Sequence, residues 1–61
     1  MSSFYIELTD DEIDNAYLAL CHAIKNNGNA EAVKSFESVL SKLDPYASDI
    51  TKMVGSTMKV F

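Results

Sequence analysis

The sequence predicts an all-α fold, a helical hairpin plus a third helix that together form a small three-helix bundle. Asn27-Gly28-Asn29 and Asp44-Pro45 are turn and helix-boundary patterns, and they divide the 61 residues into three pieces. Each piece repeats its apolar residues at i, i+3, i+4 and i+7, the spacing of a helix with one buried face. We expect a single small domain, because a chain of this length holds at most one.

The first helix is expected over residues 9–27. Thr9 can accept a hydrogen bond from the backbone of Glu12 while the Glu12 side chain reaches back to the backbone of Thr9, which is the pattern of a capping box. Gly28 is the expected left-handed residue that ends the helix. The predicted buried face consists of residues at helical spacing, namely Ile13, Ala16, Tyr17, Leu20 and Ile24.

The second helix is expected over residues 29–43. Asn29 precedes it and is a favourable residue to cap the first backbone N–H groups of a helix. The apolar residues again recur at helical spacing, which predicts a face that packs against the first helix. The residues of this face are Val33, Phe36, Val39, Leu40 and Leu43.

The third helix is expected over residues 45–61, or as a shorter helix with an extended tail. Asp44 would cap it, and Pro45 would occupy its first position, where a missing N–H costs nothing. A broad apolar face is formed by Tyr46, Ile50, Met53, Val54, Thr57 and Phe61. Gly55 lies about 180° from Tyr46 around the helix, so we expect it on the polar side.

The N-terminal residues 1–8 are expected to be extended. Phe4, Ile6 and Leu8 alternate with other residues at period two, as in a strand with one apolar side. Pairing of this segment with residues 56–61 as a short two-stranded ribbon is the alternative to a fully helical third segment. An unpaired strand here would be an edge that recruits another chain.

Composition favours a protein that associates with itself. Hydrophobic residues make up 48% of the chain, too many for a disordered tail. A chain this short usually needs a disulfide, a metal or oligomerisation for stability. Cys21 is its only cysteine, which excludes an internal disulfide, so a homo-oligomer is expected.

The expected compartment is the cytoplasm. A single cysteine is typical of a reducing environment. The first 24 residues contain no Lys or Arg, so the charged start of a signal peptide is missing. The longest apolar run, Ala16 to Cys21, is far shorter than the ~20 residues that span a membrane. We therefore expect no association with a membrane.

Negative charge is concentrated near the start of the chain. Residues 1–24 contain five acidic and no basic residues, whereas residues 25–61 contain four acidic residues and five lysines. There is no arginine, which disfavours direct binding of nucleic acid. The acidic residues are Glu7, Asp10, Asp11, Glu12 and Asp14. They suit the start of a helix, where the helix dipole favours negative charge, and equally a contact with a basic partner.

The residue types of enzymes are scarce, so we expect no catalytic site, cofactor or metal. Cys21 and His22 are adjacent and point about 100° apart on a helix, whereas a nucleophile and its base must converge. We expect a half-buried thiol and an exposed imidazole. One Cys and one His cannot supply the four ligands of a structural zinc site. A calcium loop beginning at Asp10 would need Gly where Asn15 stands.

Residues 17–45 resemble a single tetratricopeptide-type helical hairpin. The matching positions are Tyr17, Leu20, Gly28, Ala32, Phe36 and Pro45. The sequence departs from that pattern at Cys21, where a small residue is expected. The resemblance covers less than half of the chain and implies a helical pair that packs against neighbouring elements and binds protein.

These observations predict a non-enzymatic, acidic protein-interaction module that acts as a stoichiometric inhibitor or adaptor of a larger protein. Small acidic chains of this kind suit the inhibitors that viral genomes encode. The residues expected to contact the partner are Phe4, Tyr5, Ile50, Val54, Met58 and Phe61. The alternative is an acidic mimic of nucleic acid, in which the acidic residues occupy the basic groove of a DNA- or RNA-binding protein.

Overall fold

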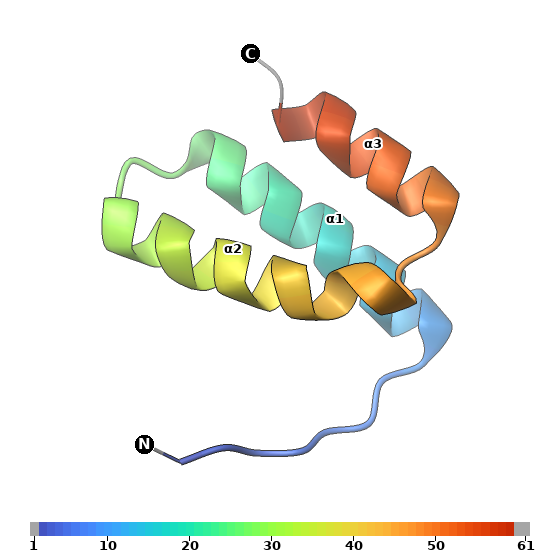
Figure 1. The fold of residues 1–61 in the computed structure, drawn as a ribbon. Helices are drawn as coiled ribbons and strands as arrows, with labels where there is room; N and C mark the ends of the chain where they lie inside the picture. The colour runs from blue at the N-terminus through green and yellow to red at the C-terminus, as the bar shows by residue number, and fades with distance from the viewer. Residues whose placement is uncertain (1, 60–61) are drawn as a thin grey trace.

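The computed structural model describes residues 2–59, and for the last two of these only the backbone. It contains the helices α1 (Asp10–Asn26), α2 (Ala30–Leu43) and α3 (Asp49–Lys59), and the short 3-10 turn η1 (Asp44–Tyr46) (Figure 1). The predicted all-α arrangement is thereby confirmed. No strand occurs among the described residues, so the alternative pairing of the two ends is not formed there.

α1 is the central helix of the fold. α2 packs against one side of it and α3 against another, and α2 and α3 make little contact with each other (Figure 1). The molecule is consequently flat, with dimensions of 33 × 31 × 14 Å. Residues 2–9 have no regular secondary structure and run below α2 in the view of Figure 1.

The thin core lies where α1 meets the other elements. Its buried apolar residues are Tyr17, Cys21, Leu40 and Ala47. Partly buried residues that pack against them are Ile13, Leu20, Ile24 and Leu43. The predicted inner faces of the first two helices therefore point inward, except that Val39 is 43% exposed.

The ends of α1 and α2 follow local rules, with one correction. The backbone N–H of Glu12 donates to Thr9 Oγ1 at 3.2 Å, and the Thr9 N–H donates to Glu12 Oε1 at 2.8 Å, which confirms the capping box. Asn29 accepts from the first N–H groups of α2, as predicted. Gly28, however, is not left-handed. α1 instead ends in an extended residue, Asn27, whose side chain accepts from the Asn29 N–H.

The capping box makes helix content depend on pH at the acidic end. The hydrogen bond to the Thr9 backbone, and then that to its hydroxyl, lower the pKa of Glu12 below its usual 4.5. The stabilisation is therefore present above pH 4.5 and is lost as the pH falls through the lower pKa of the folded state. In an acid titration followed by circular dichroism, we expect Glu12→Gln to lose less helix than the wild type. Identical losses would contradict this role.

The third helix begins later than the sequence predicts. α3 starts at Asp49, and Ser48 caps it by accepting the Thr51 N–H at 3.2 Å. Asp44 and Pro45 lie instead in η1, which continues the path of α2. The reason is that the Asp44 carboxylate is used elsewhere, where it accepts a hydrogen bond from the Tyr17 hydroxyl at 3.1 Å.

Candidate functional site

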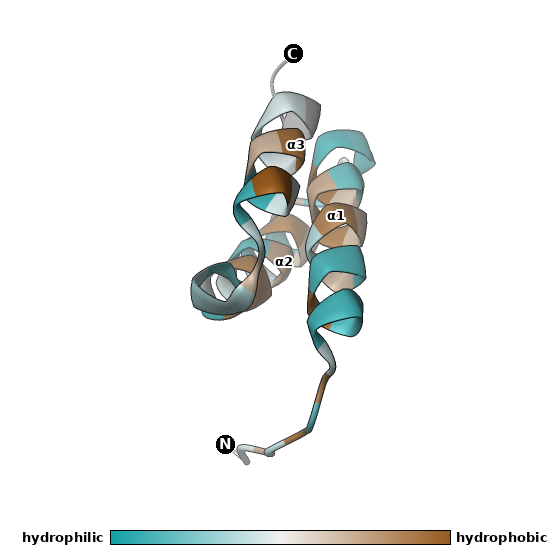
Figure 2. Cartoon of the chain, turned by 90° about the vertical axis from the view of Figure 1, so that its right-hand side faces the viewer, coloured by the Kyte–Doolittle hydropathy of each residue, from teal (hydrophilic) through white to brown (hydrophobic). Residues whose placement is uncertain are grey.

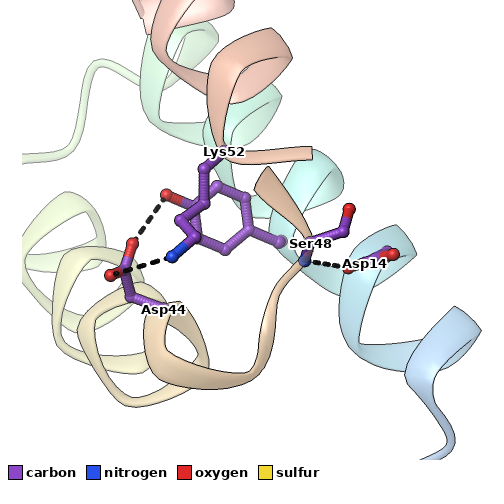
Figure 3. Close-up of polar contacts among 5 residues, drawn as sticks. Asp14, Asp44, Ser48 and Lys52 are labelled. Atoms are coloured by element: carbon purple, nitrogen blue, oxygen red, sulfur yellow. Dashed lines mark hydrogen bonds and ion pairs between the residues drawn. The ribbon is translucent and has the colours of Figure 1, made fainter. Parts of the chain in front are cut away.

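Three polar contacts hold α3 against α1 at the corner of the fold (Figure 3). Asp44 accepts from Tyr17 and lies 4.0 Å from the Lys52 ammonium group, and the Ser48 N–H donates to Asp14 Oδ1 at 3.0 Å. The ion pair is partly exposed and contributes little energy. Together, however, the contacts link η1, α1 and the start of α3, and so fix where α3 begins.

A close approach at Gly55 sets the rotation of α3 about its axis. A Cβ atom at this position would lie 2.8 Å from both Cys21 Sγ and Tyr17 Cε1, closer than real contacts allow. Thr51, one turn earlier, is only 7% exposed. The expectation that Gly55 faces solvent is therefore wrong. The absence of a side chain lets the α3 backbone lie directly on the core of α1.

This rotation turns the apolar residues of α3 outward. Ile50, Met53 and Val54 stand at i, i+3 and i+4 and are 76%, 70% and 44% exposed. We call these three residues the α3 ridge. The apolar face expected for the third helix, which includes these three residues and two of the predicted partner contacts (Ile50 and Val54), is therefore exposed, because the small residues of α3 face α1. In Figure 2, brown bands mark the hydrophobic residues along α3, whereas the first turns of α1 are teal, that is, hydrophilic.

A second apolar surface lies between the N-terminal segment and the end of α2. It is a groove of about 700 Å³. The apolar residues that line it are Phe4, Ile6, Leu8, Ile13, Val39, Leu43 and Tyr46. Glu7 and Lys42 are its only charged lining residues within the part of the chain that the structure describes. We call this surface the N-terminal groove.

The structure places the predicted partner-binding residues on both surfaces. Phe4 lines the N-terminal groove and is 85% exposed, while Tyr5 beside it is fully exposed. Ile50 and Val54 belong to the α3 ridge. Met58 lies within α3, but its side chain is outside the described part, and Phe61 lies outside the described residues altogether.

Tyr46 and Met53 belong to the apolar face expected for the third helix but are not among the predicted partner contacts. They are both 70% exposed. The pattern that could have revealed this is the spacing of Ala47, Thr51 and Gly55, small residues at every fourth position. Such a row permits close approach of two backbones.

The acidic residues are divided among several roles. Glu12 accepts a hydrogen bond from the Thr9 N–H in the capping box, and Asp14 accepts one from the Ser48 N–H. Glu7 lines the N-terminal groove. Asp10 and Asp11 are exposed in the first turn of α1. Because two of the five have structural contacts, the structure gives no added support to mimicry of nucleic acid, which stays a prediction testable by the salt dependence of binding.

Cys21 and His22 do not converge. The Cys21 side chain is 0% exposed in the core, more deeply buried than the half-buried thiol that we expected. His22 is exposed and lies beside Asn26, which donates to its backbone carbonyl at 2.9 Å. Burial follows from the position of Cys21 under Gly55 of α3. A thiol enclosed in this way cannot attack a substrate without local opening of the fold.

Metal binding and membrane insertion find no support in the described residues. Among them, no three His, Cys, Asp or Glu side chains are grouped closely enough to hold a metal ion. None of the described helices combines the length and the hydropathy needed to cross a bilayer. Comparison with protein-family models, curated proteins and solved structures finds no match to this chain.

Proposed function

We propose that this chain is a non-enzymatic protein-interaction module that binds through the α3 ridge and the N-terminal groove. The observation that carries the proposal is the distribution of large apolar side chains. Among the described residues, the buried apolar ones are Tyr17, Cys21, Leu40 and Ala47. The exposed large ones are more numerous: Phe4, Tyr5, Ile6, Leu8, Val39, Tyr46, Ile50, Met53 and Val54. Contiguous exposed apolar surface of this kind is typical of interaction sites.

The total surface is larger than that of a compact monomer. A folded monomer of this length is expected to expose about 3,900 Å². The chain exposes 4882 Å². The surplus of roughly 1,000 Å² includes the extended N-terminal segment, where Phe4, Tyr5 and Ile6 are 85%, 101% and 76% exposed.

The chemistry of the two surfaces suits a protein partner. The α3 ridge is a convex helical face with apolar residues at i, i+3 and i+4, the arrangement that anchors a helix in a groove of another protein. The N-terminal groove is mainly apolar, with one acidic and one basic residue, Glu7 and Lys42. Neither surface offers the cluster of positive charge that phosphate binding requires.

A module of this kind acts by occupying a partner in fixed stoichiometry, as an adaptor or an inhibitor. Small size and net negative charge suit inhibitors of the sort that viral genomes encode. The proposed compartment is the cytoplasm, where a chain with one cysteine keeps its thiol reduced. Burial of Cys21 also protects that thiol within the fold.

Replacing Ile50 with aspartate is expected to abolish capture of the partner. The substitution places a charge at the centre of the α3 ridge, and a truncated or charged anchor residue typically costs 2 kcal/mol or more of binding energy, a loss of roughly 30-fold. The measurement is quantitative affinity capture by the tagged protein from extracts of cells that make it, with the stoichiometry of the recovered complex.

Ser56→Asp is the matched control, because it adds the same charge to the same helix at an exposed position away from the ridge. It should retain the partner at the wild-type ratio. Equal capture by both variants would refute binding through the ridge. Catalytic turnover of a captured substrate, in place of a stable complex, would refute the proposed function as a whole.

A further inference from the structure

The N-terminal segment, residues 2–8, leaves the hydrogen-bonding groups of its backbone without partners. The segment is extended and contains no turn (Figure 1). Within the part of the chain that the structure describes, none of its N–H or C=O groups takes part in a hydrogen bond. Hydrogen bonding begins only at Thr9, whose N–H donates to Glu12 Oε1 at 2.8 Å. The segment therefore presents the open row of donors and acceptors that is typical of an unpaired strand.

The side chains of the segment also suit a strand. Phe4, Ile6 and Leu8 line the N-terminal groove at every second position. Tyr5 does not line it and is fully exposed, while Glu7 lines it as the one charged residue of the segment. Aromatic and β-branched residues are enriched in strands. Natural edge strands commonly carry lysine or proline to prevent pairing, and this segment contains neither.

We propose, resting on the function proposed above, that the partner is a protein with an exposed edge strand of a β-sheet, to which residues 2–8 add as a further strand. In this mode of recognition, main-chain hydrogen bonds supply affinity and alternate side chains supply specificity. The backbone selects a strand over a helix as the contact on the partner. A helix satisfies its own N–H and C=O groups internally, so only another extended chain offers the segment a row of donors and acceptors.

Strand addition also accounts for the N-terminal groove. Side chains of paired strands project in register on the same face of a sheet. Alternate residues of the partner strand therefore stand beside Phe4 and Ile6 and point toward Val39 and Leu43 across the groove of about 700 Å³. Because the lining of the groove is mainly apolar, we expect the partner strand to carry apolar side chains at every second position.

A second copy of this chain is a poorer partner than a protein that already contains a sheet. In the described part of the chain, the regular elements are the three helices and the turn η1, so a second copy offers only the same unpaired segment. Two such segments would form a two-stranded ribbon, which is marginally stable in water. On the edge of an existing sheet, the segment instead becomes part of three or more strands.

The test removes single backbone donors. Successive N–H groups of a strand point to opposite edges, so only alternate ones face the partner. Full-length chains made by chemical synthesis carry one N-methylated amide, at Phe4, Tyr5, Ile6 or Glu7, and are titrated against the protein that the wild type captures. We expect one alternate pair, either Phe4 and Ile6 or Tyr5 and Glu7, to lose affinity roughly 10-fold or more, and the other pair to change less than about twofold.

These variants keep every side chain, so differences between them report the backbone alone. N-methylation of the Gly28 amide is the matched control, because Gly28 lies in the exposed connection between α1 and α2 and its N–H has no hydrogen-bond partner within the described residues. It should bind as the wild type does. Circular dichroism of the free variants should be unchanged, since residues 2–8 make no backbone hydrogen bond to the helices within the described structure.

Amide hydrogen exchange of the isotopically labelled chain gives a second readout. In the free protein, the N–H groups of residues 3–8 should exchange rapidly, while that of Thr9, which is bonded to Glu12, serves as a protected reference. In the complex, the same alternate amides that are sensitive to N-methylation should become protected.

The outcomes separate this inference from the function on which it rests. N-methylation that has no effect, or an equal effect at neighbouring positions, would overturn strand addition and leave the captured complex, and so the proposed function, standing. Protection of alternate amides in the free protein that rises with its concentration would show pairing of two copies, and would overturn a sheet in another protein as the partner. Failure of the wild type to capture any protein would refute the proposed function together with the inference.

Discussion

Replacing Gly55 with leucine is expected to lower the free energy of unfolding by about 3 kcal/mol or more, the upper end of the cost of overpacking a core. A Cβ atom alone would lie 2.8 Å from Cys21 Sγ and from Tyr17 Cε1. Both of these residues are buried, so neither side chain can move aside without exposing or displacing the core. The measurement is urea denaturation followed by circular dichroism.

Gly55→Ala separates two opposing effects at the same position. Alanine gains about 1 kcal/mol of helix propensity over glycine. The clash with Cys21 and Tyr17 costs about 1–3 kcal/mol. Because the atoms that would be struck are enclosed, we expect the clash to outweigh the gain and the variant to be less stable than the wild type.

Gly28 provides the matched control for this prediction. A Cβ there would meet nothing within 4 Å, and its backbone is not left-handed. Gly28→Ala should therefore be neutral or gain about 0.4–1 kcal/mol through the reduced freedom of the unfolded chain. If Gly55→Ala were stabilised to the same extent, α3 would not pack through Gly55, and the outward position of the α3 ridge would lose its basis.

Replacing Tyr17 with alanine is expected to cost about 3–5 kcal/mol, the range for deleting a large buried aromatic side chain. Small proteins have about 5–15 kcal/mol of stability in total, so the variant should be largely unfolded or close to it. Tyr17 is the largest side chain of the buried core and contacts the α3 side through Gly55 and the η1 side through Asp44. The measurement is again denaturation by urea, with thermal melting as an independent check.

Tyr17→Phe isolates the hydrogen bond to Asp44. It keeps the ring and removes only the hydroxyl, so we expect a loss of about 1 kcal/mol. Equal destabilisation by the Phe and Ala variants would show that the hydroxyl, and not the buried ring, supports the core.

Ionisation of Tyr17 is expected to destabilise the folded protein at alkaline pH. Burial, and then the hydrogen bond to the Asp44 carboxylate and its negative charge, raise the pKa of Tyr17 above 10.0. The associated stability is fully present below pH 10 and is lost as the pH rises through the higher pKa of the folded state. Tyr17→Phe should lack this loss. With Tyr5 and Tyr46 replaced by phenylalanine, the absorbance change of ionisation reports Tyr17 alone.

The polar contacts at the corner explain why the start of α3 was not predictable from local pattern. Asp44-Pro45 is a favourable helix start by residue type. Ser48 is equally able to cap a helix, and the choice between them depends on where the Asp44 carboxylate is needed. Because Tyr17 lies 27 positions away in the sequence, its hydrogen bond to Asp44 has no local signature.

The candidate site likewise combines features that are evident in the sequence with features that depend on the fold. The apolar character of Phe4, Ile50 and Val54 is evident in the sequence, and their residue types suggest either a core or a contact with a partner. Their exposure is decided by what covers them in the fold. Only the position of the N-terminal segment below α2 creates the groove, since its walls come from residues more than 30 positions apart in the sequence.

Local sequence pattern is sufficient to predict three helices, the capping box of α1, the cap of α2 and most of the inner faces of the first two helices. Each of these depends on residues within one or two turns, where spacing and hydrogen-bonding groups are sufficient. The buried face of α3, in contrast, depends on tertiary packing. That helix has one apolar stripe and one stripe of small residues, and hydropathy favours the first. The stripe of small residues is the one that is buried. Because Gly55 has no side chain, the backbone of α3 can lie in direct contact with Tyr17 and Cys21.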